Sequence, residues 1–234
     1  MLRLLPYQER DGATNMAADE ALLETAADRG LASLRFYAWS EPTVSLGYFQ
    51  PAEAASRIPG NLPWVRRSTG GEAIVHHHEL TYAIAFPDSK EWRSPEPWTC
   101  RFHYLIRAVL AEREIESRAV LCGEERRLGE VLCFLNQTPG DLQIEGSKVV
   151  GSAQRKRKGA ILQHGSILLA RSEFASMLPG ISDFAREPVY LKWLAERLAA
   201  QFDTQPSDWT PQEIERAAAI RAEKYANPEW NRKR

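Results

Sequence analysis

Strand-like segments fill the middle of this chain, whereas helix-like segments lie mainly towards its ends. Apolar runs bounded by turn residues predict strands at 33–39, 43–49, 63–67, 73–76, 80–86, 148–154 and 160–170. Apolar residues with helical spacing predict helices at 15–29, 98–113, 188–202 and 211–225. A doubly wound parallel sheet needs strands and helices to alternate, and here they do not. The order therefore predicts an α+β fold with a mixed, largely antiparallel β-sheet flanked by helices.

The first helical segment, 15–29, is expected to lie against the sheet. We expect Thr14 or Asn15 to cap it, and Asp19 and Glu20 to lie near the positive end of its dipole. Apolar residues recur at every fourth position and so share one face of the helix: Ala18, Leu22 and Ala26. The sequence thus predicts an amphipathic helix with one buried face.

The composition is that of an ordinary globular protein, and it excludes several other classes. Of the 234 residues, 44% are hydrophobic, and the net charge of −1 gives no general attraction to nucleic acid or to an anionic membrane. No apolar run reaches the roughly 18 residues of a membrane span, and the N-terminus lacks the pattern of a signal peptide. Cys100, Cys122 and Cys133 are widely spaced, so we expect neither a disulfide framework nor structural zinc. These features predict a cytoplasmic protein.

A glycine pair, Gly70-Gly71, separates the predicted strands 63–67 and 73–76. Glycine lets a backbone approach a ligand closely, so the amides of such a loop can meet an anion or a carbonyl oxygen. The simpler interpretation is a tight hairpin turn between the two strands. The flanking Arg66-Arg67 and His76 favour a binding role without excluding the hairpin.

Small residues interrupt the predicted strand 148–154. Gly151, Ser152 and Ala153 indicate that something packs close to the backbone there, and Lys148 could direct its ammonium group into the space. The alternative is a solvated lysine on a strand weakened by glycine.

Cys133 lies in an apolar run, where most cysteines are small buried hydrophobes. A nucleophilic cysteine needs a nearby cation or base that holds it as a thiolate. Lys148 follows across a predicted turn at 138–140, and a hairpin there would bring the ammonium group close to the sulfur.

Two further patterns are less specific. His76 and His78 would share one face of a strand, but no third ligand stands at a meaningful spacing, so we expect no metal site. The basic run 155–158 predicts either a solvated hairpin tip or a docking patch for an acidic partner.

Taken in order, the motifs of this chain resemble those of the biotin/lipoate protein ligase superfamily. Besides His76 they occupy 15–22, 36–37, 45–50, 66–71, 79–82, 148–154, 163–169, 224–225 and 229–230. The resemblance implies a fold in which a mixed sheet and flanking helices enclose an acyl-binding tunnel. It also implies a single catalytic domain over 1–234, without the accessory C-terminal domain of many ligases.

The superfamily includes enzymes that use ATP and enzymes that use a cysteine. Lipoate–protein ligases activate lipoate as an adenylate. Octanoyltransferases take octanoate from acyl carrier protein onto a cysteine and pass it to a lysine of a lipoyl-bearing protein. A related amidotransferase moves the acyl group from the glycine cleavage H protein, also through a cysteine.

Three features resemble the cysteine-dependent octanoyltransferase branch. Glu72 stands where the ligases carry a third glycine, and a carboxylate beside an adenylate phosphate would cost on the order of several kcal/mol at an effective dielectric near 20. The run 77–80 differs from the Asp and Gly-Asn that usually follow the loop histidine of the ligases. Cys133-Phe134 stands where the octanoyltransferases carry their nucleophile.

The resemblance also implies roles for individual residues. Cys133 would attack the donor thioester, while Lys148 would hold the sulfur as a thiolate and stabilise the oxyanion. His76 and His164 are candidates for the base that serves the acceptor lysine. The implied substrate-binding residues are Arg67, Gly70, Gly71, His76, Gly151, Ser152, Ala153, His164 and Gly165.

The implied partners are acyl carrier protein and the lipoyl domains of 2-oxoacid dehydrogenases or the glycine cleavage H protein. Whether the acyl donor is the carrier protein or the H protein stays open. No cofactor is expected, and ATP and Mg would be required only by a lipoate–protein ligase. A non-enzymatic module that binds an acyl carrier or a lipoyl domain is the remaining alternative.

Overall fold

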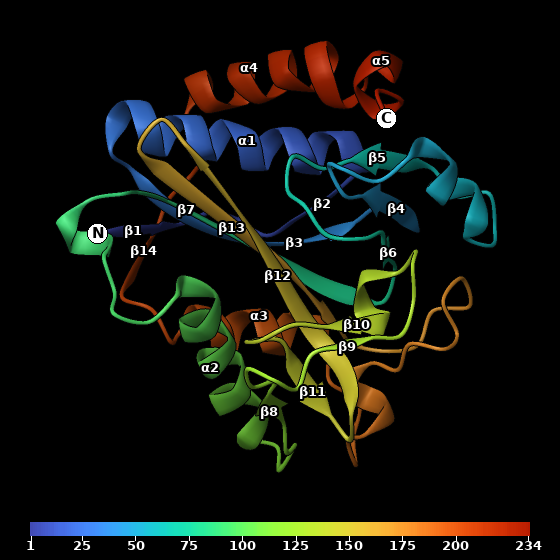
Figure 1. Ribbon diagram of the computed structural model, residues 1–234. Coiled ribbons are helices and arrows are strands. Elements are labelled where there is room, and N and C mark those ends of the chain that lie inside the picture. Colours follow the sequence, from blue (N-terminus) through green and yellow to red (C-terminus); the bar gives the residue numbers. More distant parts are fainter.

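The computed structural model describes all 234 residues, and one large mixed sheet forms its centre (Figure 1). Its strands lie in the order β14-β1-β3-β7-β13-β12-β11-β8, with β2 also paired to β3. Parallel pairs occur only among β14, β1, β3 and β2, and all other pairs are antiparallel, as the sequence predicts. The strands are β1 (Leu2–Leu4), β2 (Gln8–Arg10), β3 (Ala32–Trp39), β7 (Glu79–Pro87), β8 (Arg118–Ala119), β11 (Leu142–Ile144), β12 (Ser147–Arg157), β13 (Ala160–Leu168) and β14 (Thr204–Pro206).

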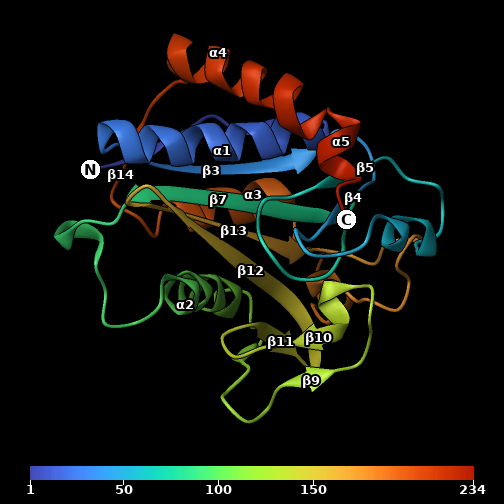
Figure 2. The ribbon, with the colours of Figure 1, turned by 45° about the horizontal axis from the view of Figure 1, so that its top comes forward.

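Helices cover both faces of this sheet (Figure 2). Helix α1 (Gly12–Arg29) lies on one face, and α4 (Pro211–Ile220) packs over it. The opposite face carries α2 (Trp98–Ala111) and α3 (Leu191–Ala199). The remaining helical segments are short: η1 (Ala52–Arg57), η2 (Lys90–Trp92), η3 (Cys133–Leu135), η4 (Ile181–Asp183), the π-helical η5 (Arg221–Tyr225) and α5 (Pro228–Asn231). None of the helices has the combination of length and apolar character that crossing a membrane requires.

Helix α1 begins earlier than predicted and is buried on more than one face. Asp11, rather than Thr14 or Asn15, caps it by accepting a hydrogen bond from the Thr14 amide. Because the helix starts at Gly12, Asp19 lies too far along it to interact with the dipole at its start, and it is buried instead. The predicted apolar face is buried as expected, but α4 and η5 cover the opposite side as well.

A small three-stranded sheet lies beside the large one and contains a difference from the sequence prediction. Strand β4 (Thr43–Leu46) lies between β5 (Trp64–Arg66) and β6 (Ile74–His76), parallel to the former and antiparallel to the latter. The strands on either side of the glycine pair therefore do not pair with each other. The hairpin interpretation of this loop is wrong, because the loop passes across the end of β4.

Two hairpins position the strands that face this small sheet. Strands β11 and β12 are joined by a turn at Glu145-Gly146, and β12 and β13 by a turn at Lys158-Gly159. The predicted hairpin at 138–140 is not formed, because β10 (Asn136–Gln137) pairs with β9 (Arg126–Arg127) instead. Lys148 reaches the neighbourhood of Cys133 through the β11–β12 hairpin.

Candidate active site

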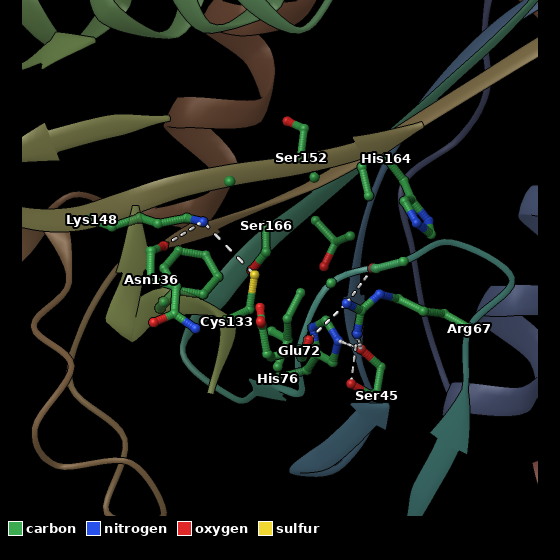
Figure 3. A pocket seen from close by; sticks show the side chains of 18 of the residues that line it. Ser45, Arg67, Glu72, His76, Cys133, Asn136, Lys148, Ser152, His164 and Ser166 are labelled. Atoms are coloured by element: carbon green, nitrogen blue, oxygen red, sulfur yellow. Dashed lines mark hydrogen bonds between the residues drawn. The ribbon is translucent and has the colours of Figure 1, made fainter. Parts of the chain in front are cut away.

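A cavity of about 200 Å³ lies between the large sheet and the small one, next to η3. A single water needs only roughly 10–15 Å³, so this space is large enough for a ligand. All the residues that the sequence singles out for catalysis or substrate binding line its wall: Arg67, Gly70, Gly71, His76, Cys133, Lys148, Gly151, Ser152, Ala153, His164 and Gly165. Figure 3 shows that they come from both sheets and from the segment that begins η3.

The glycine loop forms one side of the cavity, and Arg67 holds its shape. The Arg67 guanidinium donates to the carbonyl oxygens of Gly70 and Glu72, both at 2.7 Å, and to that of Ser45 at 2.8 Å. Gly71 has a φ of +89°. Residues with a side chain rarely adopt this backbone conformation, which explains the glycine at this position. The Arg67 side chain is fully buried and forms no ion pair with a carboxylate, so its charge remains available to the cavity.

Cys133 is attached to this loop through the backbone. Its amide donates to the carbonyl of Ala73, and the Ala73 amide donates to that of Val131, both at 2.8 Å. These bonds hold the sulfur over the glycine loop, where a methyl group added at Gly71 would lie 3.8 Å from it. The same added methyl would lie 2.9 Å from the Arg67 guanidinium, so this cation also faces the space around the sulfur.

Lys148 approaches the sulfur from the opposite side of the cavity (Figure 3). Its Nζ lies 3.8 Å from the Cys133 sulfur, 3.1 Å from the Asn136 carbonyl oxygen and 2.8 Å from a carboxylate oxygen of Asp141. Burial alone lowers the pKa of Lys148, but the negative charges of Cys133 and Asp141 outweigh this and raise the pKa above its usual value. The buried lysine therefore stays protonated and can stabilise a thiolate.

Gly151 provides the space that this lysine occupies. A methyl group at Gly151 would lie only 2.6 Å from the Lys148 Cε, so any side chain there would displace the ammonium group. Ser152, the next residue, lines the cavity, but its hydroxyl group points to the other side of β12 (Figure 3). There it lies 2.5 Å from both the Tyr82 hydroxyl and Nε2 of His103.

His76 is held by partners on both ring nitrogens. Nδ1 lies 2.6 Å from a carboxylate oxygen of Glu79, and Nε2 lies 2.8 Å from the Ser45 hydroxyl. The ring also stacks on Trp39 with 3.7 Å between centroids. Burial lowers the pKa of His76, despite the opposing effect of Glu79, so the ring is neutral at neutral pH.

His164 is held in a similar way at another position on the wall. Its Nδ1 lies 3.0 Å from a carboxylate oxygen of Asp19, and its Nε2 lies 2.8 Å from the Thr69 hydroxyl. Neither His76 nor His164 therefore presents a free ring nitrogen in this arrangement. The neighbouring His77 and His78 stack on each other outside the cavity, and no group of three or more His, Cys, Asp or Glu side chains is arranged to hold a metal ion.

Comparison with known proteins places this geometry in a family. The family model described as the lipoyl protein ligase A/B catalytic domain matches residues 11–191, a span that contains every residue of the cavity wall named above. The chain belongs to this family. Among curated relatives, the octanoyltransferase LipM of Lysinibacillus sphaericus is 32% identical over 94% of both chains. The octanoyltransferase LipM of Brevibacillus brevis is 30% identical over 99% of both chains.

Two solved structures with the same fold are named lipoate protein ligases. A lipoate-protein ligase A bound with ATP has a TM-score of 0.76 at 23% identity, covering 98% of both chains. The bipartite lipoate protein ligase of Thermoplasma acidophilum, studied with its E2 lipoyl domain, has a TM-score of 0.73 at 21% identity. That comparison covers 98% of this chain and 95% of the other. At these identities the likeness establishes the lipoate ligase fold predicted from the sequence.

Sequence reasoning missed the carboxylates behind the wall of this lipoyl ligase-type cavity. Asp141 pairs with Lys148, Glu79 with His76, and Asp19 with His164. Asp19 also accepts hydrogen bonds from Arg35 and the Tyr37 hydroxyl, which accounts for its burial within α1. The sequence did contain a signal for Asp19, because this acidic residue lies next to the apolar face of its helix. That position favours a buried carboxylate with a polar partner over an interaction with the helix dipole.

The basic run 155–158 differs from a simple solvated tip. Arg155 donates to the Ser68 carbonyl at 2.6 Å, and Arg157 pairs with Glu20 at 2.9 Å, so both arginines tie β12 to neighbouring elements. Lys156 pairs with Asp88, whereas the exposed Lys158 forms neither an ion pair nor a side-chain hydrogen bond. At most the two lysines of the run are free to meet a partner.

Proposed function

We propose that this protein is an octanoyltransferase of lipoate biosynthesis. It would take an octanoyl group from acyl carrier protein onto Cys133 and pass it to a lysine of a lipoyl-bearing protein. Relatives named octanoyltransferase LipM that match almost the full chain support this proposal. The observation that carries it is the 3.8 Å distance between the Lys148 ammonium group and the Cys133 sulfur on the wall of one cavity.

In the first half-reaction, the Cys133 thiolate attacks the carbonyl carbon of the donor thioester. The new C–S bond forms as the bond to the carrier thiol breaks, and the departing thiolate takes a proton from solvent. Lys148 lies where it can stabilise both the attacking sulfur and the oxyanion, and the amides around Gly70, Gly71 and Gly151 are further candidates for the oxyanion. Since one thioester replaces another, the step needs no ATP.

In the second half-reaction, the neutral amine of an acceptor lysine attacks the acyl-enzyme carbonyl. The C–N bond forms, the C–S bond breaks, and the electron pair returns to the sulfur next to Lys148. The acceptor would be a lipoyl domain, the kind of partner studied with the bipartite ligase of Thermoplasma acidophilum. A base for the amine proton would be His76 or His164 only if one of them leaves its present hydroxyl partner.

The test is the intact mass of the protein after incubation with octanoyl-acyl carrier protein, with and without ATP. We expect one octanoyl group to be added without ATP and to be removed by hydroxylamine, because it is held as a thioester. Cys133→Ala should prevent the addition, whereas Cys100→Ala and Cys122→Ala should not. An adduct that persists in Cys133→Ala would contradict the assignment of the nucleophile.

The same incubation separates the alternatives. Octanoyl-H protein in place of the acyl carrier protein tests the amidotransferase, and the faster donor identifies the physiological class. A lipoate–protein ligase would instead catalyse lipoate-dependent exchange between ATP and pyrophosphate, which we expect to be weak because Glu72 lines the cavity. A binding module would form a complex with the carrier without becoming acylated.

A further inference from the structure

Glu72 contributes the only carboxylate to the wall of the catalytic cavity. Its backbone is fixed by the Arg67 guanidinium at 2.7 Å, and it directly follows the glycine that faces the Cys133 sulfur. In Figure 3, its side chain reaches into the same part of the cavity as that sulfur. Glu72 also lines a second, more open groove. The other residues that line this groove are Glu125, Arg126, Arg127, Asn136, Gln137 and Thr138. Glu72 therefore stands where the cavity opens to the surface.

The other carboxylates near the cavity are already engaged. Asp141 forms a buried ion pair with Lys148 at 2.8 Å, and Glu79 lies 2.6 Å from His76 and also accepts hydrogen bonds from Ser166 and Thr81. Glu72 has one ionic contact, 4.0 Å from the Arg127 guanidinium, whose side chain is 79% exposed. Such an exposed and distant pair contributes little energy. The charge of Glu72 also partly offsets the lowering of the Arg67 pKa by burial, but the two side chains form no ion pair, so the carboxylate oxygens are available to another cation.

The cations around Cys133 would repel the acceptor lysine, and the Glu72 carboxylate can offset this repulsion. Lys148 and the unpaired Arg67 both face the sulfur, and they suit a thiolate. Acylation removes the negative charge of the thiolate, and the cavity then repels a second cation. The acceptor lysine arrives mainly as an ammonium ion, because its ordinary pKa is about 10.4.

We propose that Glu72 binds the ammonium group of the acceptor lysine at the mouth of the cavity and so selects a cationic amine as the second substrate. This inference rests on the proposed function. The bound ammonium loses one proton to solvent, its nitrogen attacks the acyl carbon, and the C–S bond breaks to give the Cys133 thiolate. The amide nitrogen then loses its second proton to solvent. Glu72 increases the occupancy of the amine without acting as the base, so its effect falls on the KM for the acceptor.

The experiment starts from octanoylated wild-type and Glu72→Gln proteins and measures the loss of the acyl group to two nucleophiles. One is a lipoyl-domain acceptor, and the other is hydroxylamine, which is mainly neutral at pH 7.5. For Glu72→Gln we expect a kcat/KM towards the acceptor that is at least about 10-fold lower, mainly through KM. Cleavage by hydroxylamine and the initial uptake of octanoate should change by less than about twofold.

Glu130→Gln is the matched control. Glu130 lies three residues before Cys133, lines neither the cavity nor the groove, and pairs only with the exposed Arg57. It should keep the wild-type rate with both nucleophiles. An unchanged acceptor rate in Glu72→Gln would overturn the inference, and so would an equal loss with hydroxylamine, which would indicate a structural role. If the wild-type protein takes up no octanoate, the proposed function itself fails. If the wild-type protein is octanoylated but Glu72→Gln reacts with the acceptor as the wild type does, only the role of Glu72 fails and the proposed function stands.

Discussion

Lys148 and Asp141 form a buried ion pair, with 2.8 Å between the ammonium nitrogen and a carboxylate oxygen and less than one-tenth of either side chain exposed. The Asp141 carboxylate also accepts hydrogen bonds from the amide and hydroxyl of Thr138, so its position is fixed independently of the lysine. Asp141 therefore holds Lys148 in place independently of the state of the Cys133 sulfur, and its charge is one of the two that raise the pKa of the lysine. A lysine of this kind can act in both half-reactions of an acyl transfer.

Replacing Lys148 should therefore remove activity in a specific way. Lys148→Met keeps the length of the side chain but removes its charge, and we expect acyl transfer to slow by at least about 10²-fold. Alkylation of Cys133 by iodoacetamide at pH 7 should also slow, because the sulfur loses the neighbouring cation that would stabilise its reactive form. The measurement is the rate of both reactions, with the exposed Lys158→Met as the control.

The stability of this variant provides a second readout. Removing Lys148 leaves the Asp141 carboxylate buried without its partner, which should cost about 3–5 kcal/mol of unfolding free energy. The double variant Lys148→Met, Asp141→Asn should recover much of the stability without recovering activity. If the double variant regains acyl transfer, the lysine has no direct part in the chemistry.

Gly151→Ala tests the same geometry from the other side of the lysine. The added methyl group would lie 2.6 Å from the Lys148 Cε, so the ammonium group must move away from the sulfur. We expect a modest loss of stability, about 1–3 kcal/mol, and a larger loss of acyl transfer than this would suggest. X-ray structure and alkylation rate check the prediction, and an unmoved lysine with a normal rate would contradict it.

The sequence predicts the fold class and about half of the residues that line the cavity, because these depend on local periodicity and on motifs that stay recognisable. It does not predict what lies behind the wall. The partners of Lys148, His76 and His164 are set by the packing of segments distant in the sequence: Asp19, for example, lies 145 residues from His164. The local sequence also does not predict that β4 lies between β5 and β6. The short loop that joins β5 to β6 favours a hairpin, but each of these strands pairs with β4 instead.

Buried histidines should make the stability of the protein sensitive to mild acid. Burial lowers the pKa of His103, outweighing its 2.6 Å contact with the Gly140 carbonyl and the charge of Asp141, and burial also lowers the pKa of His76. The folded protein keeps these rings neutral where the unfolded chain binds protons, so stability is lost as pH falls below about 6.5. Each such ring contributes a slope of up to about 1.4 kcal/mol per pH unit, down to its folded pKa.

Denaturant unfolding at pH 7.5, 6.5, 6.0 and 5.5 measures this slope. His103→Gln should reduce the pH dependence of the unfolding free energy by the contribution of one histidine ring. His78→Gln, at an exposed position, should leave this dependence unchanged. An identical slope in wild type and His103→Gln would show that His103 is not the group that titrates.

The two kinds of basic residue at the β12–β13 hairpin should behave differently. Arg155 binds the Ser68 carbonyl next to the glycine loop, and Arg157 binds Glu20 on α1, so Arg155→Ser and Arg157→Ser should lower the free energy of unfolding. Lys156 and Lys158 are exposed, and the double variant Lys156→Ser, Lys158→Ser should leave the free energy of unfolding within about 0.5 kcal/mol of the wild-type value.

Acyl carrier proteins are generally acidic, so we expect the double lysine variant to be acylated by the carrier a few-fold more slowly at low salt. The difference should disappear as salt shortens the screening length to about 8 Å or less. Hydrolysis of a small octanoyl thioester should not change, because it needs the cavity but not the hairpin tip. If the double lysine variant reacts with the carrier at the wild-type rate at low salt, the two lysines only solvate the turn, and the carrier docks elsewhere, for example around the exposed Arg126 and Arg127 of β9.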